Sequence, residues 1–263
     1  MKRFFLPLAL LLLLAGCGGS GTWGWYVIDP TTPAGWTNIK FLISGMGSTI
    51  LISVIAAAIS IVLGLIVALP GQSSNRWLRL INRVYVEFIR SIPLLPMLFW
   101  VFYGLPIVFR SMGLNIPIDP FWGAIITLAL SDSAFTAEIY RSGIQSIARG
   151  QTEAAQTIGL TYTQTMRYVV LPQALGVILP PLTNQMLSLI KESAILSTIT
   201  VQEMTMTALR IQGETFRPFE AFIMIALLYW LLNEVVAIGM RRLERRFTQR
   251  TRRAAPIKIE ASR

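Results

Sequence analysis

Hydrophobic residues in this chain are gathered into long, nearly continuous stretches that short polar segments separate. After residue 40, five of these stretches have about the length needed to cross the hydrocarbon core of a bilayer, which is roughly 30 Å thick. They cover residues 48–69, 92–108, 121–140, 172–199 and 219–240. Only helices and closed barrels can span lipid without leaving backbone groups unpaired, and stretches of this length suit helices. The pattern therefore predicts an all-α polytopic membrane protein with about five transmembrane helices.

A further segment, residues 75–90, is amphipathic. Arg76, Arg79 and Arg83 alternate with apolar side chains at helical spacing, which favours a helix lying at the membrane interface. More arginines follow the third and fifth apolar stretches, whereas the loops on the other side hold few. Because Lys and Arg gather on the cytoplasmic side, we expect a multi-pass protein of the bacterial cytoplasmic (inner) membrane, with its N terminus outside and its C terminus in the cytoplasm.

The composition agrees with a membrane location and excludes most enzyme classes. Of the 263 residues, 54% are hydrophobic and 14% are charged, and the mean hydropathy is +0.59. The formal net charge of +10 does not indicate a nucleic-acid partner, because the basic residues lie at the ends of apolar stretches. The chain has no histidine and only one cysteine, Cys17, which excludes Cys/His catalysis, structural zinc and disulfides. We therefore expect no catalytic residue, no metal and no cofactor.

The N-terminal residues have the pattern of a processing signal. A basic start precedes an apolar run, residues 4–14, that is too short to span a bilayer. The run is followed by Ala-Gly before Cys17, which resembles a bacterial lipobox, so residues 1–17 are predicted to be a signal peptide and Cys17 a lipidation site. An uncleaved signal anchor is the alternative. Either interpretation places residues 18–40, which show no sustained helical pattern, outside the cytoplasm as a lead-in.

Residues 141–171 are polar enough to leave the membrane between the third and fourth stretches, and they predict two short helices. The first contains Glu153-Ala154-Ala155, which are strong helix formers, and ends at Gly159 in a left-handed conformation. Two adjacent alanines let this helix approach another surface closely, and Glu153 gives it a charge for orientation. A solvated cytoplasmic loop is the alternative.

The second short helix has start signals of its own. Thr161 and Gln164 fit a capping box, and Pro172 suits the first turn of the helix that follows.

The same loop resembles a known motif. Glu153-Ala154-Ala155, Gly159 and Val169-Val170-Leu171-Pro172 are similar in spacing to the EAA signature of ABC importer permeases, with Val169 where that family usually has Ile. The segments 85–95, 102–106, 133–144 and 189–193 are similar to the permeases for polar amino acids, the family for His, Glu, Gln, Arg and opines. The resemblance covers residues 41–247.

This resemblance implies the type I ABC importer permease fold, with a permease domain over 41–247, a coupling loop at 141–171 and a basic cytoplasmic tail at 248–263. It implies that the coupling residues dock on an ATPase subunit; they are Glu153, Ala154, Ala155, Gly159 and Pro172. Expected partners are two ATPase subunits, a second permease copy or homologue, a periplasmic or lipid-anchored binding protein, membrane lipids and a polar amino acid. The chain is expected not to be an enzyme, because it lacks the G-x-x-x-x-G-K-[ST] loop and ATP must be hydrolysed by a partner. A permease for another small polar solute, or a non-ABC membrane transporter, is the alternative.

Polar residues inside the predicted spans are candidates for contact with a substrate, because ionisable groups in a bilayer are costly and tend to face a cavity. The candidates for this substrate pathway are Asp132, Asn184, Ser188, Lys191 and Glu192. A structural role between packed helices is the alternative for Asp132, Lys191 and Glu192. Elsewhere, Glu138 with Arg141 and Glu87 with Arg90 have the spacing of ion pairs within a helix.

Overall fold

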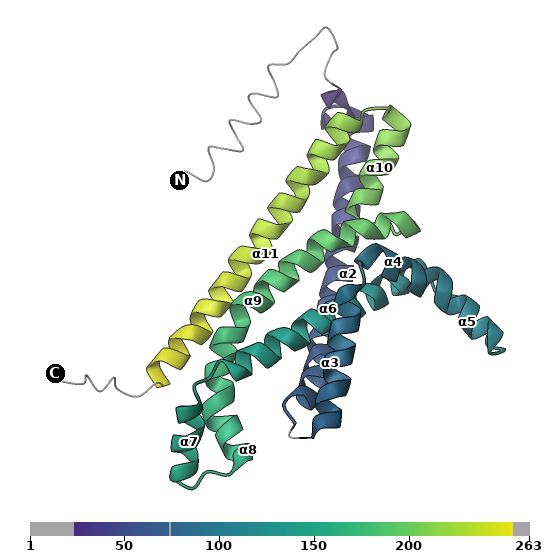
Figure 1. Cartoon of the computed structure of the whole chain (residues 1–263). Helices are drawn as coiled ribbons and strands as arrows, with labels where there is room; N and C mark the ends of the chain where they lie inside the picture. The colour runs from purple at the N-terminus through teal and green to yellow at the C-terminus, as the bar shows by residue number, and fades with distance from the viewer. Residues whose placement is uncertain (1–23, 74, 255–263) are drawn as a thin grey trace.

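A computed structural model describes residues 24–73 and 75–254, and within those ranges all regular structure is helical, without a strand (Figure 1). The predicted all-α class is therefore confirmed. Cys17, the predicted signal peptide at 1–17 and the last residues of the basic tail lie outside the described residues.

The first long helix, α2 (Pro33–Gly71), follows a short 3₁₀ turn, η1 (Trp25–Ile28). The side chain of Thr32 caps it by accepting a hydrogen bond from the Gly35 amide at 3.1 Å, and Pro33 occupies its first turn. The helix starts well before the predicted stretch at 48–69, and the expectation that residues 18–40 lack helical structure is wrong from Pro33 onward. Small residues interrupt the apolar pattern in the early part of the helix, so the sequence did not reveal it. These residues allow close packing: a Cβ on Gly45 would lie 2.7 Å from the side chain of Thr207.

The amphipathic segment forms the expected helix, α3 (Arg76–Ser91), and the side chain of Asn75 caps it by accepting from the Trp77 amide. It packs against α2 and α6, and the side-chain amide of Asn82 donates to the Val67 carbonyl of α2 at 2.6 Å. The next stretch is built from three joined pieces: α4 (Leu94–Phe99), the π-helical turn η2 (Trp100–Gly104) and α5 (Leu105–Ser111). Figure 1 shows α5 projecting away from the rest of the bundle.

The remaining long helices are α6 (Pro120–Gln145), α9 (Leu171–Glu192) and α11 (Pro218–Ala254). The predicted stretch 172–199 ends in a 3₁₀ segment, η4 (Ser193–Ile199), and a short helix not expected from the sequence, α10 (Met204–Thr215), returns along α2 before α11 begins. The most extensive packing is between α2 and α6, and α9 packs against α6, α11 and α2. The largest core cluster joins α2, α4, α6, α9 and η4; its most buried large side chains are Ile52, Leu98, Leu128, Leu189 and Leu196.

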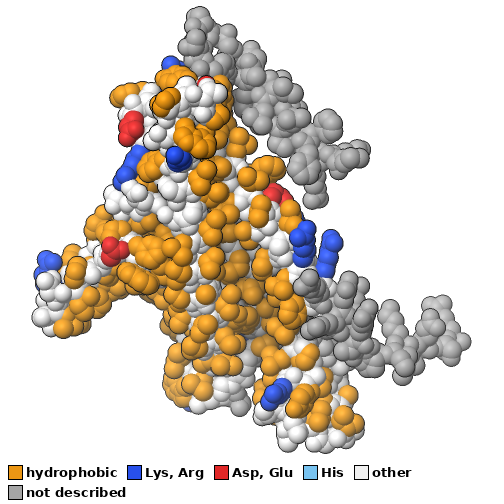
Figure 2. All heavy atoms as spheres, turned by 180° about the vertical axis from the view of Figure 1, so that it is seen from behind, with side chains coloured by type: hydrophobic (Ala, Val, Ile, Leu, Met, Phe, Trp, Pro, Cys, Tyr) orange, Lys and Arg blue, Asp and Glu red, His pale blue; other side chains and the backbone are white. Residues whose placement is uncertain are grey.

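Within the described residues, three helical segments are long and apolar enough to cross a membrane: Pro33–Gly71, Leu94–Ser111 and Pro218–Arg245. The helices α6 and α9 are more polar, and they lie among the others with several of their polar side chains paired inside the bundle. Hydrophobic side chains cover much of the face shown in Figure 2, and its charged side chains are few. An apolar outer surface is expected where lipid is the solvent.

Candidate functional site

The predicted loop contains two short helices, α7 (Arg149–Thr157) and α8 (Tyr162–Thr165), which lie at the opposite end of the molecule from α10 (Figure 1). On α7, the side chains of Glu153 and Ala154 are exposed. Ala155 is 4% exposed and packs against its own chain, where α7 contacts α8 and the segment after it. The surface available to a partner is therefore the Glu153 and Ala154 side, and Ala155 holds α7 in place.

Gly159 ends α7 as the sequence predicted. Its φ is +86°, in the left-handed region that only glycine adopts without a steric penalty. The Leu160 amide donates to the Ala155 carbonyl at 3.1 Å, and the Gly159 amide donates to the Gln156 carbonyl at 2.9 Å. These two bonds form a Schellman motif. A Cβ at Gly159 would meet nothing within 4 Å, so the requirement for glycine comes from the backbone conformation and not from crowding.

The second helix carries the predicted capping box between Thr161 and Gln164. It does not end before the fourth span, because the π-helical turn η3 (Met166–Val170) joins α8 directly to α9. Pro172 lies in the first turn of α9, as expected. The Gln173 side chain also donates to the Gln151 side chain of α7 at 3.4 Å. The loop is therefore one folded unit that is continuous with α9.

Asp132 is the centre of a polar cluster between three helices. Its side chain accepts hydrogen bonds from Ser60 of α2 at 2.5 Å, from Gln185 of α9 at 2.6 Å and, weakly, from Thr136 at 3.4 Å. Asp132 itself is 1% exposed. The cluster fixes α2, α6 and α9 relative to one another, and the carboxylate is enclosed in this arrangement.

The other candidates for contact with a substrate belong to α9, and they are less buried than Asp132. Asn184 and Lys191 are exposed, and Ser188 and Glu192 are half-buried. The spacing of Asn184, Ser188 and Lys191 places them on one helical face, turned away from the buried positions such as Met186 and Leu189. The structure thus separates Asp132, which is inside the bundle, from a polar face of α9 that its own chain leaves uncovered.

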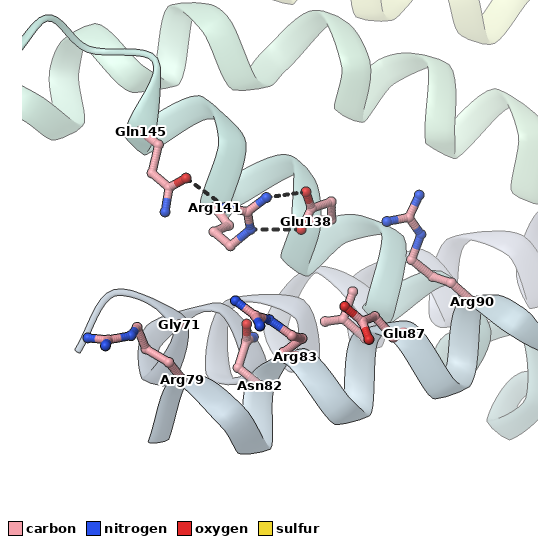
Figure 3. A pocket seen from close by; sticks show the side chains of 10 residues that line it. Gly71, Arg79, Asn82, Arg83, Glu87, Arg90, Glu138, Arg141 and Gln145 are labelled. Atoms are coloured by element: carbon pink, nitrogen blue, oxygen red, sulfur yellow. Dashed lines mark hydrogen bonds and ion pairs between the residues drawn. The ribbon is translucent and has the colours of Figure 1, made fainter. Parts of the chain in front are cut away.

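The two expected ion pairs have opposite outcomes. Glu138 and Arg141 pair, with contacts of 2.8 and 2.5 Å. Glu87 and Arg90 do not pair, as Figure 3 shows. The guanidinium of Arg90 lies instead over the ring of Phe135, 5.1 Å from the ring centre, because helix packing offers it an aromatic face on α6.

A second buried carboxylate, Glu203, was missed by the sequence reasoning. It is fully buried and caps α10 by accepting from the amides of Thr205 at 2.8 Å and Met206 at 2.7 Å. The hydroxyl of Tyr229 on α11 donates to it at 2.8 Å. An acidic residue directly before Met-Thr-Met-Thr at the start of a helix is the signal that could have identified this cap.

A family profile described as "Binding-protein-dependent transport system inner membrane component" matches residues 60–249, which include α6, the loop and α9. The chain belongs to this family. The predicted membrane permease is therefore confirmed at the level of the family: the chain is a membrane component of a binding-protein-dependent transport system.

Relatives and solved structures agree with this family. The chain is 40% identical over 209 residues to a probable glutamine ABC transporter permease protein, GlnM, of Bacillus subtilis, covering 80% of this chain and 94% of that protein. It is 34% identical over 211 residues to the glutamine transport system permease protein GlnP of Escherichia coli, with the same coverage of 80% and 94%. A crystal structure of an amino acid ABC transporter with histidines superposes with a TM-score of 0.73 at 36% identity, covering 80% of this chain and 96% of that chain. The predicted type I ABC importer permease fold agrees with these neighbours.

Proposed function

We propose that this permease is the transmembrane subunit of an ATP-driven importer of polar amino acids. It works with two ATPase subunits, a second permease copy or homologue and an external binding protein. The observation that carries the proposal is the α7–α8 unit, which presents Glu153 and Ala154 at one end of the bundle and continues without a break into α9. The substrate class is supported by the names of the relatives, which are amino acid permeases.

The proposed orientation puts the loop in the cytoplasm and the N-terminal residues outside. The side chains of Arg79 and Arg83 line the same pocket as Arg141, near the loop end of α6, and the positive-inside rule assigns that side to the cytoplasm. Cys17 remains a proposed lipidation site on the outer side.

Glu153 is proposed to contact the ATPase subunit. Because it is exposed and α7 is held by Ala155 and the Schellman bonds, reversing its charge should leave the loop folded. We expect Glu153→Lys to lower capture of the ATPase subunit and ATP-driven uptake by at least about tenfold, the effect of losing about 1.4 kcal/mol at an interface. Pull-down of the ATPase and uptake of labelled glutamine into proteoliposomes measure both.

Glu214→Lys is the matched control, since Glu214 is exposed at the far end of α10 and carries the same charge. Normal ATPase capture by Glu153→Lys would exclude Glu153 from the docking surface. If the complex takes up a polar solute that is not an amino acid, and does not take up glutamine, the proposal of an importer stands and the proposal of amino acids as its substrates is wrong.

The substrate pathway is proposed to run along the uncovered face of α9, between this chain and a second permease. A polar face is costly against lipid, so Asn184, Ser188 and Lys191 need water, a substrate or another subunit beside them. In this proposal Lys191 and Glu192 offer opposite charges to a zwitterionic amino acid, and Asp132 acts from inside the bundle by holding α9 through Gln185.

Lys191→Ala is expected to reduce glutamine uptake by at least about tenfold while ATPase capture stays normal, because a charge-assisted hydrogen bond contributes about 1.5–3 kcal/mol. Lys40→Ala is the control, since Lys40 is an exposed lysine of α2 that lies over Trp36. Uptake that is equal in the two variants would remove Lys191 from the pathway. Loss of ATPase capture with Lys191→Ala would assign it to subunit packing.

A further inference from the structure

A basic pocket of about 300 Å³ lies between α3 and the end of α6, outside both the loop and the polar face of α9 (Figure 3). Its volume is at the small end of the range of ligand pockets, about 300–1,000 Å³. Four arginines and two glutamates are among its lining residues: Arg79, Arg83, Arg90, Arg141, Glu87 and Glu138.

The arginines in this pocket differ in whether they have a carboxylate partner. Arg141 is held by Glu138 and also donates to Gln145 at 2.6 Å. Within the described part of the chain, Arg83 and Arg90 have no carboxylate partner, and Figure 3 shows both guanidinium groups beside the pocket. The four guanidinium groups of the pocket outnumber its two carboxylates, so the lining keeps a net positive charge. Guanidinium groups in excess are suited to phosphate, which they bind with paired hydrogen bonds.

The pocket opens toward an apolar surface. A shallower hollow of about 430 Å³ shares Arg79 and Arg83 with it and is also lined by Trp77 and Leu80. On the outward side of α3, Ile81 is 63% and Phe88 is 64% exposed. A ligand seated on the arginines would therefore have Trp77 and Leu80 beside it, with Ile81 and Phe88 farther round the helix.

The position along the bundle matches the level of lipid headgroups. The pocket contacts Gly71, at the end of α2, and Gln145, at the end of α6, where the apolar parts of both helices give way to polar residues. Basic pockets between transmembrane helices on the cytoplasmic side recognise the headgroups of anionic lipids. A soluble acidic partner would explain the arginines but not the adjoining apolar surface.

We infer that this pocket binds the phosphate headgroup of an anionic phospholipid, with Arg83 and Arg90 on the phosphate and the acyl chains along the outer side of α3. The site is separate from the proposed coupling and transport residues. It would join α3 to α6 through a bound lipid.

The test uses the full-length chain, purified in an uncharged detergent and titrated with short-chain phosphatidylglycerol or phosphatidylcholine, with bound lipid counted by native mass spectrometry. Phosphatidylglycerol should bind saturably and phosphatidylcholine should not. The Arg83→Gln, Arg90→Gln double variant should bind phosphatidylglycerol at least about tenfold more weakly, a loss of about 1.4 kcal/mol or more, since it removes two charge-assisted hydrogen bonds. The matched control is Arg242→Gln with Arg245→Gln, two exposed arginines of α11. It loses the same charge and should bind normally.

The inference is overturned if both double variants bind phosphatidylglycerol equally, or if phosphatidylcholine binds as tightly. Displacement by inorganic phosphate at the same concentrations would identify free phosphate as the ligand and reject the lipid. If the Arg83→Gln, Arg90→Gln variant binds lipid normally but no longer captures the ATPase subunit, the two arginines contact the ATPase and not a lipid. If the glutamine variant does not fold, Arg83→Lys with Arg90→Lys keeps the charge but not the paired geometry, and binding equal to wild type would then contradict the inference.

Discussion

The Gly159→Val variant is expected to lose ATP-driven uptake and ATPase binding together. Valine in the left-handed conformation found here, with φ of +86°, costs about 1–2 kcal/mol or more because its branched Cβ meets the backbone. The variant should relieve this strain by breaking the Schellman bonds of Leu160 and Gly159, which redirects the chain leaving α7. We expect glutamine uptake and ATPase capture each to fall more than tenfold, measured in proteoliposomes and by pull-down from the same preparations.

Two control substitutions distinguish the effect of backbone conformation at Gly159 from the effect of adding a larger side chain to α7. Gly159→Asn should retain most activity, since asparagine adopts the left-handed region more readily. Gly150→Ala should be neutral or slightly stabilising, because Gly150 lies in α7 with open space around a new Cβ. Full uptake and ATPase binding in Gly159→Val would reject the coupling role of this loop.

The Asp132→Ala variant is expected to be the least stable of the single substitutions. It removes an acceptor shared by Ser60 and Gln185. The Ser60 hydroxyl can still donate to the Ala57 carbonyl at 3.0 Å, so the half-buried amide of Gln185 is the donor that loses its partner. Interhelical hydrogen bonds in membrane proteins contribute about 0.6 kcal/mol each and up to about 1.7, and the unpaired Gln185 amide adds to the loss. The free energy of unfolding should therefore fall by about 2–3 kcal/mol, seen as a lower midpoint in thermal unfolding of the detergent-purified chain.

Ser53→Ala is the control for this loss, because the Ser53 hydroxyl is buried on α2 without a hydrogen-bond partner. Its removal should be neutral or stabilising. Asp132→Asn keeps the shape and one acceptor, so an intermediate stability is expected. If Asp132→Ala unfolds at the wild-type midpoint but loses uptake, Asp132 contacts substrate and does not serve mainly to join the helices.

The parts of the fold predicted correctly from the sequence are those set by local chemistry. The capping box of Thr161 and Gln164 and the end of α7 at Gly159 each depend on residues within a few positions of one another. The ion pair of Glu138 with Arg141 is equally local. Such features can be read from spacing because the helix itself fixes the distance.

The features that the sequence did not reveal depend on contacts between distant segments. Asp132 was recognised as unusual, but its partners Ser60 and Gln185 are 72 and 53 positions away, and spacing carries no information about such pairs. The failed pair of Glu87 with Arg90 has the same cause, since Phe135 of another helix determines where Arg90 lies. The start of α2 at Pro33 was missed because small residues that pack against α10 interrupt the apolar pattern.

The helix α9 remains α-helical through Pro180 and Pro181, and this has a mechanical consequence. Neither proline has an amide hydrogen, so the carbonyls of Gly176 and Val177 lose their usual partners within the helix. The two missing bonds lie between the end of α9 that is fused to α8 and the end that carries Lys191. Backbone hydrogen bonds therefore constrain α9 less near its middle than elsewhere. In the proposed coupling role, a displacement of α7 is expected to bend α9 at this point and to shift its polar half without unwinding the helix.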